Sequence, residues 1–203
     1  RKPDFVDAGD AGNGIECDND ASGTNATPIT RPQLSNFTMV GPNDATGTAA
    51  NHNYSMRWRR RTQFVIRNSI MIGHPDAGFS MESDGTLNDY YVNGLSEFRN
   101  NLLQATTSIY RSSNNNICTA AQIQAKAESE GCVTLATSAA AQLTSPFFSI
   151  TPNFLPATGS PALTGASFTG MNPFFTSTTF RGAMGATDWT TGWAVWDPQN
   201  KSY

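Results

Sequence analysis

Charged side chains are scarce in this chain of 203 residues. Lysine, arginine, aspartate and glutamate together make up 14% of it, whereas ordinary soluble domains carry about 25%. The formal net charge is −3, so the chain lacks the concentrated basic surface that binding of nucleic-acid phosphates requires. We therefore expect no nucleic-acid partner.

Long apolar runs are absent as well. No stretch approaches the roughly 18 apolar residues that a membrane-spanning helix requires, so the sequence predicts no transmembrane segment. Histidine occurs twice and cysteine three times. Neither His52 nor His74 has a second ligand residue at the spacing of a metal site, and we assign neither histidine a role.

The chain does contain a repeat of 32 residues, centred on the segment VIRNSIMIG at residues 65–73. The segment LSNFTMVG precedes it at that spacing, and FRNNLLQ follows it at the same spacing. Each copy consists of two short runs rich in Ile, Val, Leu, Phe and Met on either side of an asparagine. Runs this short predict strands, and a fixed spacing predicts stacked coils.

The asparagine of each copy marks a corner between two strands. Asparagine tolerates the left-handed backbone conformation, and its amide can hydrogen-bond the equivalent amide one coil above or below. The sequence therefore predicts an asparagine ladder along the stack, made of Asn36, Asn68 and Asn100.

A further strand in each coil carries charges on its outer face. GIECDND at residues 14–20 resembles GFSMESD at residues 78–84, and SMRWRRR at residues 55–61 is the candidate between them. Alternate side chains of a strand point to opposite faces, and opposite charges on neighbouring strands attract. The sequence thus predicts an all-β fold, a right-handed parallel β-helix with three visible coils. Its outer face alternates acidic, basic and acidic: Glu16, Asp18 and Asp20; Arg57, Arg59 and Arg61; Glu82 and Asp84.

Three parts follow from this interpretation. Residues 1–111 form β-helix coils, which we expect to be the last coils of a longer solenoid because no polar cap precedes Gly14. Residues 112–133 form a short helical insertion. Residues 134–203 are interrupted by prolines, which exclude helix and central strand, and form an extended C-terminal wrap or cap. Within the coils, residues 84–94 read as a loop that could project from the solenoid.

The insertion contains a capping box of Thr119 and Gln122, which predicts a helix. Cys118 and Cys132 flank this helix, and a disulfide between them would clamp both of its ends in an oxidising compartment. Cys17 is then left over. Its place on the inward face of a strand predicts a buried free thiol.

Acidic side chains crowd the first residues of the chain. Loops rich in oxygen ligands can bind Ca²⁺, and the candidate ligands are Asp7, Asp10, Asp18 and Asp20. Their spacing fits neither the EF-hand loop nor the nonapeptide calcium repeat. A solvated, turn-rich loop explains the same residues, so calcium is the weaker interpretation and we expect no cofactor.

Three tryptophans near the end of the chain allow two interpretations. Sugar rings stack on exposed indoles, so Trp189, Trp193 and Trp196 could form a carbohydrate platform. A cap that plugs the open end of the solenoid uses the same residues, and we favour this second interpretation.

Several segments resemble a known group of proteins. GSPAL at residues 159–163 and FRGAMG at residues 180–185 are similar to the "SPAI…GA" ending that follows the last coils of many secreted parallel β-helix proteins of Bacteroidota. GIECDND, VIRNSIMIG and DWTTGWAVWDPQN together resemble one secreted or surface-anchored group of these. The resemblance implies the architecture and a secreted or cell-surface location, and it brings no catalytic residues.

Many β-helix proteins are polysaccharide lyases or glycoside hydrolases, which is the alternative function. A hydrolase needs two carboxylates about 5–10 Å apart, which Asp18 and Asp20, or Asp18 and Glu82, could provide. A lyase would use a basic residue, Arg57 or Arg59, beside Ca²⁺. The polygalacturonase-type pattern is incomplete, because residues 73–75 read GHP instead of GHG and no RIK strand occurs.

An ionic ladder explains the same charges without catalysis. We therefore favour a non-enzymatic solenoid that is a structural, adhesive or glycan-contacting component of a larger assembly. Its expected partners are either other protein chains of that assembly or its own missing N-terminal coils. A glycan is a further expected partner.

Overall fold

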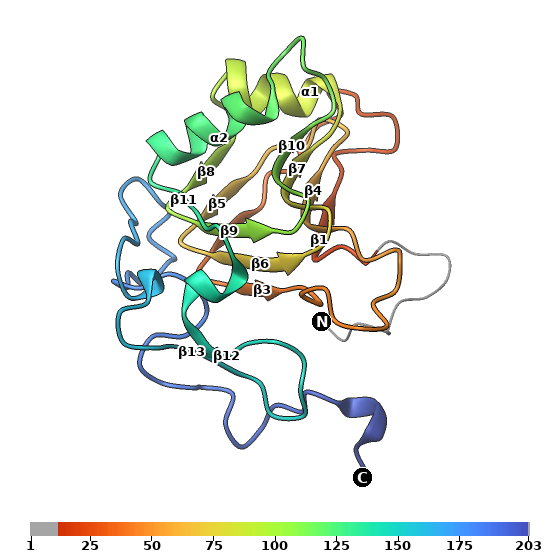
Figure 1. Ribbon diagram of the computed structural model, residues 1–203. Helices are drawn as coiled ribbons and strands as arrows, with labels where there is room; N and C mark the ends of the chain where they lie inside the picture. The colour runs from red at the N-terminus through yellow and green to blue at the C-terminus, as the bar shows by residue number, and fades with distance from the viewer. Residues whose placement is uncertain (1–11, 203) are drawn as a thin grey trace.

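Three parallel β-sheets form the body of the structure, a computed structural model that describes residues 12–202. Successive turns of the chain stack one above another, and the first three turns contribute one short strand to each sheet (Figure 1). This arrangement confirms the predicted parallel β-helix. The first sheet contains β1 (Ile15–Cys17), β4 (Tyr54–Trp58), β7 (Ala77–Met81) and β10 (Ser108–Ser112); the second contains β2 (Gln33–Ser35), β5 (Val65–Arg67) and β8 (Glu97–Arg99); the third contains β3 (Thr38–Val40), β6 (Ile70–His74), β9 (Leu102–Ala105) and β11 (Val133–Thr134).

Strand pairing follows the repeat of 32 residues. In the second sheet Leu34 pairs with Ile66, and Ile66 pairs with Phe98. In the third sheet Met39 pairs with Met71. Because the same offset holds in both sheets, each apolar side chain stacks on its equivalent in the next coil, and the inward face stays apolar along the whole stack.

A cluster of aromatic rings fills the interior of the middle coils. Phe79 and Phe98 stack with their ring centroids 3.9 Å apart, and Phe64 lies 4.8 Å from Trp58. These four rings and that of Tyr90 are fully buried. Burial of each contributes roughly 1.5–3 kcal/mol to stability, so these coils supply the strongest part of the core.

The three corner asparagines adopt the predicted left-handed conformation, with φ of 55°, 55° and 57° for Asn36, Asn68 and Asn100. Their amides do not bond to one another, which corrects the expected ladder of amide hydrogen bonds. Asn36 Nδ2 donates to the carbonyl oxygen of Phe180 at 2.8 Å, and Asn68 Nδ2 donates to that of Ser167 at 3.1 Å. The corners therefore attach the C-terminal segment to the coils.

A fourth coil follows the three that the repeat predicts. β10 pairs with β7 in the first sheet, and β11 pairs with β9 in the third. Between them the helix α2 (Ala120–Ser129) takes the place of a strand of the second sheet. The predicted capping box is present, because Thr119 accepts from the Gln122 backbone and Gln122 accepts from the Thr119 backbone.

α2 covers the C-terminal end of the core (Figure 1). Ile123 and Ala127 lie four residues apart on one helix face, and both are buried in the same cluster as Phe98 and Tyr110. This corrects the expectation that the extended wrap covers that end. No helix of residues 12–202 is long and apolar enough to cross a membrane.

Residues 84–92 are helical, which corrects the expected projecting loop. They form α1 (Asp84–Leu87) and the π-helical turn η1 (Asn88–Val92). Leu87 and Tyr90 are three residues apart, so both fall on one helix face, and both are fully buried in the core. The segment thus closes the third coil.

The three cysteines of the chain are free thiols, which corrects the expected disulfide between Cys118 and Cys132. Cys132 Sγ donates to the carbonyl oxygen of Phe98 at 3.3 Å and accepts from the backbone of Asn101 at 3.4 Å. Burial raises the pKa of the Cys132 thiol to about 12. Cys17 is only partly buried, because it lies in the first coil at the less covered end of the core.

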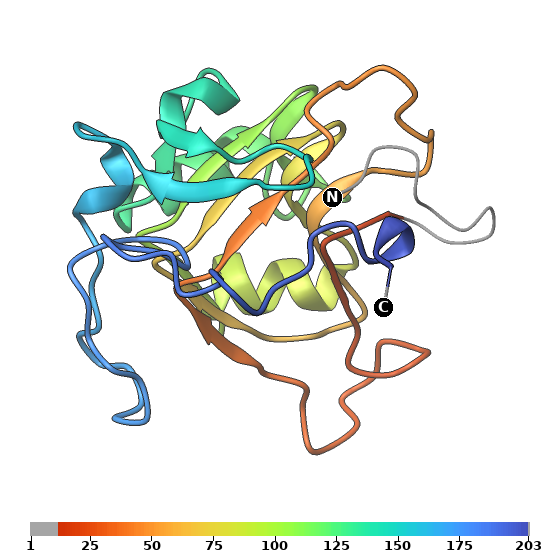
Figure 2. The same ribbon diagram turned by 90° about the horizontal axis from the view of Figure 1, so that it is seen from below.

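The residues after β11 run along the outside of the third sheet. They include the antiparallel pair β12 (Leu143–Ser145) and β13 (Asn153–Pro156) and three 3₁₀ turns, at Ser138–Ala141, Pro161–Leu163 and Pro198–Asn200. Leu135, Ala141 and Ala162 pack there against the outer side chains of the sheet. The last residues lie below β3, at the lower end of the stack (Figures 1 and 2).

Substitution of Asn68 tests the corner. Asn68→Ala leaves a non-glycine residue without an amide at φ 55°, which costs about 1–2 kcal/mol. It also removes three hydrogen bonds, two with Ser167 and one to Ser35, worth about 1 kcal/mol each. We expect a loss of about 4 kcal/mol in the free energy of unfolding, measured with urea. Asn68→Gly is the matched control and loses only the hydrogen bonds. Equal stabilities of the two variants would contradict a conformational role.

Alkylation tests the thiols. We expect iodoacetamide to modify Cys17 before Cys118 and Cys132 in the native protein, because the latter two are buried, and to modify all three after unfolding. Peptide mapping by mass spectrometry gives the order of modification. Recovery of a linked Cys118–Cys132 peptide under non-reducing conditions would contradict the free thiols and show that the disulfide forms.

Candidate functional site

Charged side chains of the first sheet form the predicted ladder on its outer face. Glu16 pairs in register with Arg57. Arg57 Nη1 lies 3.4 Å from Glu16 Oε2, and Arg57 Nη2 lies 2.8 Å from Glu82 Oε2. Arg57 therefore joins the acidic groups of the first and third coils, as the alternation predicts.

The other members extend the ladder on both sides. Arg59 Nη2 lies 2.6 Å from Glu16 Oε1, and Arg59 Nε lies 2.7 Å from Asp18 Oδ1. Arg60 Nη1 lies 2.8 Å from Asp18 Oδ2. Asp18 and Arg59, two of the candidate catalytic residues, are thus bound to each other.

The fourth coil continues the alternation with a basic residue that the sequence prediction missed. Arg111 Nη1 lies 2.5 Å from Glu82 Oε1, so Glu82 binds Arg111 on one side and Arg57 on the other. The repeat does not identify it, because Tyr110 pairs with Phe79 in β7 at an offset of 31 residues (110−79) instead of 32. Glu82 is therefore separated from Asp18 by the arginines of the second coil.

Three predicted members do not join the ladder. Asp20 lies in a turn, where its carboxylate accepts from the backbone of Ser22 and from the hydroxyl of Thr24. Asp84 begins α1 and accepts from Asn114. Arg61 follows Arg60 in a left-handed turn, with φ of 64°, and this turn ends the strand alternation before Arg61.

The electrostatics of Glu82 follow from its two arginine partners. Burial opposes ionisation of this carboxylate, but hydrogen bonds from Arg57 and Arg111 outweigh it and hold the pKa of Glu82 below its ordinary value. A general acid requires the opposite shift. Glu82 is therefore a stable anion at neutral pH.

A calcium site is not formed by the candidate ligands that the structure describes. Asp18 is bound by Arg59 and Arg60, and Asp20 stabilises its own turn. Asp7 and Asp10 lie outside the described residues. Within residues 12–202, no group of three or more histidine, cysteine or acidic side chains could hold a metal ion.

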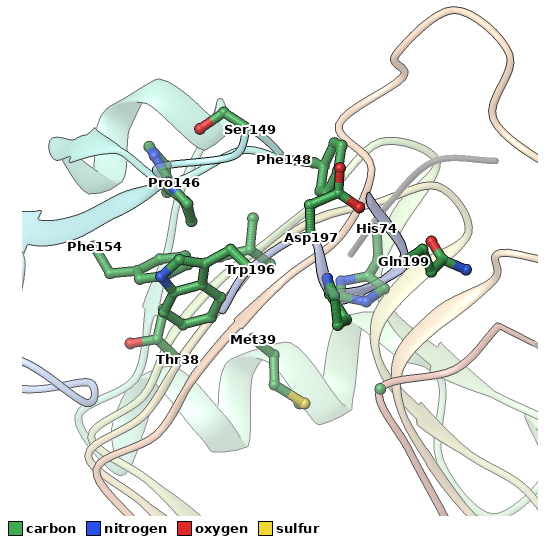
Figure 3. A pocket seen from close by; sticks show the side chains of 14 residues that line it. Thr38, Met39, His74, Pro146, Phe148, Ser149, Phe154, Trp196, Asp197 and Gln199 are labelled. Atoms are coloured by element: carbon green, nitrogen blue, oxygen red, sulfur yellow. The ribbon is translucent and has the colours of Figure 1, made fainter. Parts of the chain in front are cut away.

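A groove of about 550 Å³ opens between the third sheet and the end of the chain (Figure 3). The sequence prediction missed it, because its walls come from segments more than a hundred residues apart. His74, at the end of β6, is one of its lining residues and is buried, with Nδ1 2.7 Å from Ser55 Oγ. The lining residues are Gly14, Thr38, Met39, Val40, His74, Pro146, Phe148, Ser149, Pro152, Phe154, Trp196, Asp197, Pro198 and Gln199.

The C-terminal tryptophans do not form the predicted plug. Trp189 and Trp193 are 54% and 66% exposed, and their rings stack with centroids 5.6 Å apart at an angle of 24°. Their indole nitrogens donate to the carbonyl oxygens of Ala183 and Trp189, respectively. Because the polar atoms are bonded internally, the exposed surface of this tryptophan pair is apolar. Trp196 instead packs on Phe154.

The ladder generates a pH-dependent prediction. Glu82→Gln leaves Arg57 and Arg111 facing each other, and we expect a loss of about 1–2 kcal/mol in unfolding free energy at neutral pH. Because the folded-state pKa of Glu82 is lowered, its contribution is complete above the unfolded value of about 4.3 and disappears as the pH falls through the folded value. Urea unfolding at pH 7 and near pH 3 measures the difference.

The matched control is Asp76→Asn, at an exposed carboxylate without an ion pair among residues 12–202. We expect this control to change stability little at either pH. If the stability difference between wild type and Glu82→Gln were the same at both pH values, Glu82 would not be an ionic member of the ladder.

Comparison with protein-family models matched residues 5–152 to a pectate-lyase-like β-helix domain. A search of the curated proteins found no match, and a search of the solved structures found none either. The matched range contains every strand of the three parallel sheets. It ends before β13 and before Trp189, Trp193 and Trp196. The chain belongs to the family of pectate-lyase-like β-helix domains.

Proposed function

We propose that this chain is a non-enzymatic β-helix module, secreted or exposed at the cell surface, that contacts glycans as a component of a larger assembly. The observation that carries this proposal is the complete pairing of the ladder. Each of its three acidic groups binds two arginines; these groups are Glu16, Asp18 and Glu82.

Paired charges are poor catalysts for polysaccharide cleavage. Hydrolysis requires a carboxylic acid that donates a proton and a second carboxylate that is free to act as a base or nucleophile. Glu82 is held ionised by Arg57 and Arg111, and Asp18 is held by Arg59 and Arg60. Freeing either group would break several charge-assisted hydrogen bonds, so we assign the ladder a structural role.

The tryptophan pair supports contact with glycans. Large apolar side chains that stay exposed next to one another mark interaction surfaces, and the flat faces of indoles suit the apolar faces of sugar rings. Trp189 and Trp193 are both more than half exposed. Since neither ring covers the core, packing alone does not explain why two indoles lie there.

The family supports the proposed location. Pectate-lyase-like domains are typically extracellular, and the segments at residues 159–163 and 180–185 resemble endings of secreted β-helix proteins of Bacteroidota. Other protein chains of a surface assembly are the proposed partners.

Family membership also favours an alternative, a polysaccharide lyase or glycoside hydrolase. Its catalytic residues would be Asp18, Arg59 and Glu82. In the structure Arg59 binds both Asp18 and Glu16, whereas Glu82 binds the two other arginines Arg57 and Arg111. The alternative therefore requires the ladder to open when substrate binds.

Two measurements distinguish the functions. We expect no release of unsaturated or reducing ends from polygalacturonate or alginate. We also expect neutral polysaccharides in a native gel to retard the protein, and the double variant Trp189→Ala, Trp193→Ala to lose at least tenfold in affinity, because each indole face contributes stacking area.

Phe174→Ala is the control, since Phe174 is an aromatic residue that is 86% exposed outside the pair. It should leave retardation unchanged. Steady release of sugar ends that disappears in Asp18→Asn or Arg59→Ala would overturn the non-enzymatic function and establish the alternative.

A further inference from the structure

The groove lined by Trp196 and Asp197 lies at the boundary of the matched family domain. One wall comes from Thr38, Met39 and Val40 of β3, and another comes from residues 146–154. Trp196 to Gln199, which close the groove, follow the matched range by more than forty residues. The groove is therefore built by the C-terminal segment of this chain against the first coil, away from the ladder.

Apolar side chains form most of its surface. Trp196 lies beside Phe154, with the ring centroids 5.0 Å apart at 60°, and Met39 lines the same groove (Figure 3). This edge contact fixes the orientation of the indole, which stays 37% exposed. A fixed, partly exposed indole offers a flat surface on which a ring-shaped ligand can stack at low entropic cost.

One carboxylate oxygen in the groove has no hydrogen-bond partner. Asp197 Oδ2 accepts from Asn200 Nδ2 at 2.7 Å, whereas Asp197 Oδ1 is buried without a partner. A buried acceptor left unsatisfied costs about 1–3 kcal/mol. Because Oδ1 is closed to solvent, a ligand hydroxyl reaches it only when the side chain of Asp197 rotates toward the groove, and the new hydrogen bond would then recover this free energy.

The remaining polar residues suit hydroxyl groups. Thr38, Ser149 and Gln199 line the same groove, and each of these side chains can both donate and accept hydrogen bonds. A ligand with several hydroxyls, which also donate and accept, can use such a set. An alkylammonium ion cannot, because it only donates.

The charge of the groove selects against acidic sugars. No lysine or arginine is among the described residues that line it, whereas Asp197 contributes a carboxylate. A uronate would place a second carboxylate near the first without a cation between them, which is unfavourable at the low effective dielectric of a groove. A neutral sugar meets no such repulsion.

We propose that this groove binds a single neutral pyranose ring, stacked on Trp196 and donating a hydroxyl hydrogen bond to Asp197. The volume of about 550 Å³ lies in the range of small-molecule sites. The inference rests on the proposed contact with glycans and extends it, because it names a second site and the charge of the sugar.

Titration with small sugars tests the proposal. The probes are methyl β-D-glucopyranoside, methyl β-D-galactopyranoside and methyl α-D-mannopyranoside, and saturation-transfer NMR together with tryptophan fluorescence measures binding. We expect at least one of the three to bind. Trp196→Ala should abolish this binding. Asp197→Asn should weaken it about tenfold, because a neutral amide oxygen is a weaker acceptor than a carboxylate oxygen.

Matched variants separate binding from folding. Asp188→Asn is the carboxylate control, because Asp188 is bonded by the backbone and hydroxyl of Thr190 outside the groove, and we expect it to bind like the wild type. Trp196→Phe keeps an aromatic ring and should retain part of the affinity. Circular dichroism of each variant verifies the fold.

Several outcomes would overturn the proposal. These are a lack of response to all three glycosides, equal binding of cyclohexanol, tighter binding of sodium galacturonate, or binding of tetramethylammonium that Asp197→Asn removes. If neutral polysaccharides still retard the protein in any of these cases, and the retardation still depends on Trp189 and Trp193, the proposed function stands and only the pyranose site in the groove is refuted. Turnover of polyanions would instead refute the non-enzymatic function while leaving a measured pyranose site intact.

Discussion

Hydrogen bonds from the corner asparagines join the two halves of the molecule. The left-handed corner is required wherever the chain turns from the second sheet to the third, and it directs the amides of Asn36 and Asn68 outward to Phe180 and Ser167. Gly182 adds a bond from its backbone to the carbonyl oxygen of Asn68. The corner asparagines that each coil needs for its turn thereby also anchor the C-terminal segment, which forms one side of the groove.

At the third corner, the turn that follows α2 packs closely against the side chain of Asn100. Gly131 follows α2 at φ 85°, and a β-carbon there would lie 2.6 Å from Asn100 Nδ2. Only glycine combines this conformation with so close an approach. The helix can therefore end directly above the corner, so that α2 covers the core while the chain returns to the third sheet at β11.

The two faces of the solenoid have different consequences for function. On the first sheet, the pairing of β4 between β1 and β7 places arginines between carboxylates. Their mutual neutralisation stabilises the coils and leaves the carboxylates of the ladder bound to arginines. On the third sheet, the outer surface is apolar and is covered by the C-terminal segment. The segment continues to the first coil and leaves Trp189, Trp193 and Trp196 exposed, so the surfaces that we propose for glycan contact both belong to this segment.

The sequence by itself established the features that depend on spacing. The 32-residue offset determined the register of the second and third sheets and the left-handed corners, because each coil repeats the same local geometry. Most of the ladder followed from the alternation of charged side chains along the strands of the first sheet. Features that depend on contacts between distant segments required the tertiary structure. Arg111 could be recognised only once β10 was placed beside β7, the free thiols only once the core around Cys132 was known, and the groove only once Trp196 and Asp197 had been brought against β3. No periodicity records these contacts, since packing between segments that share no repeat leaves no regular pattern in the chain.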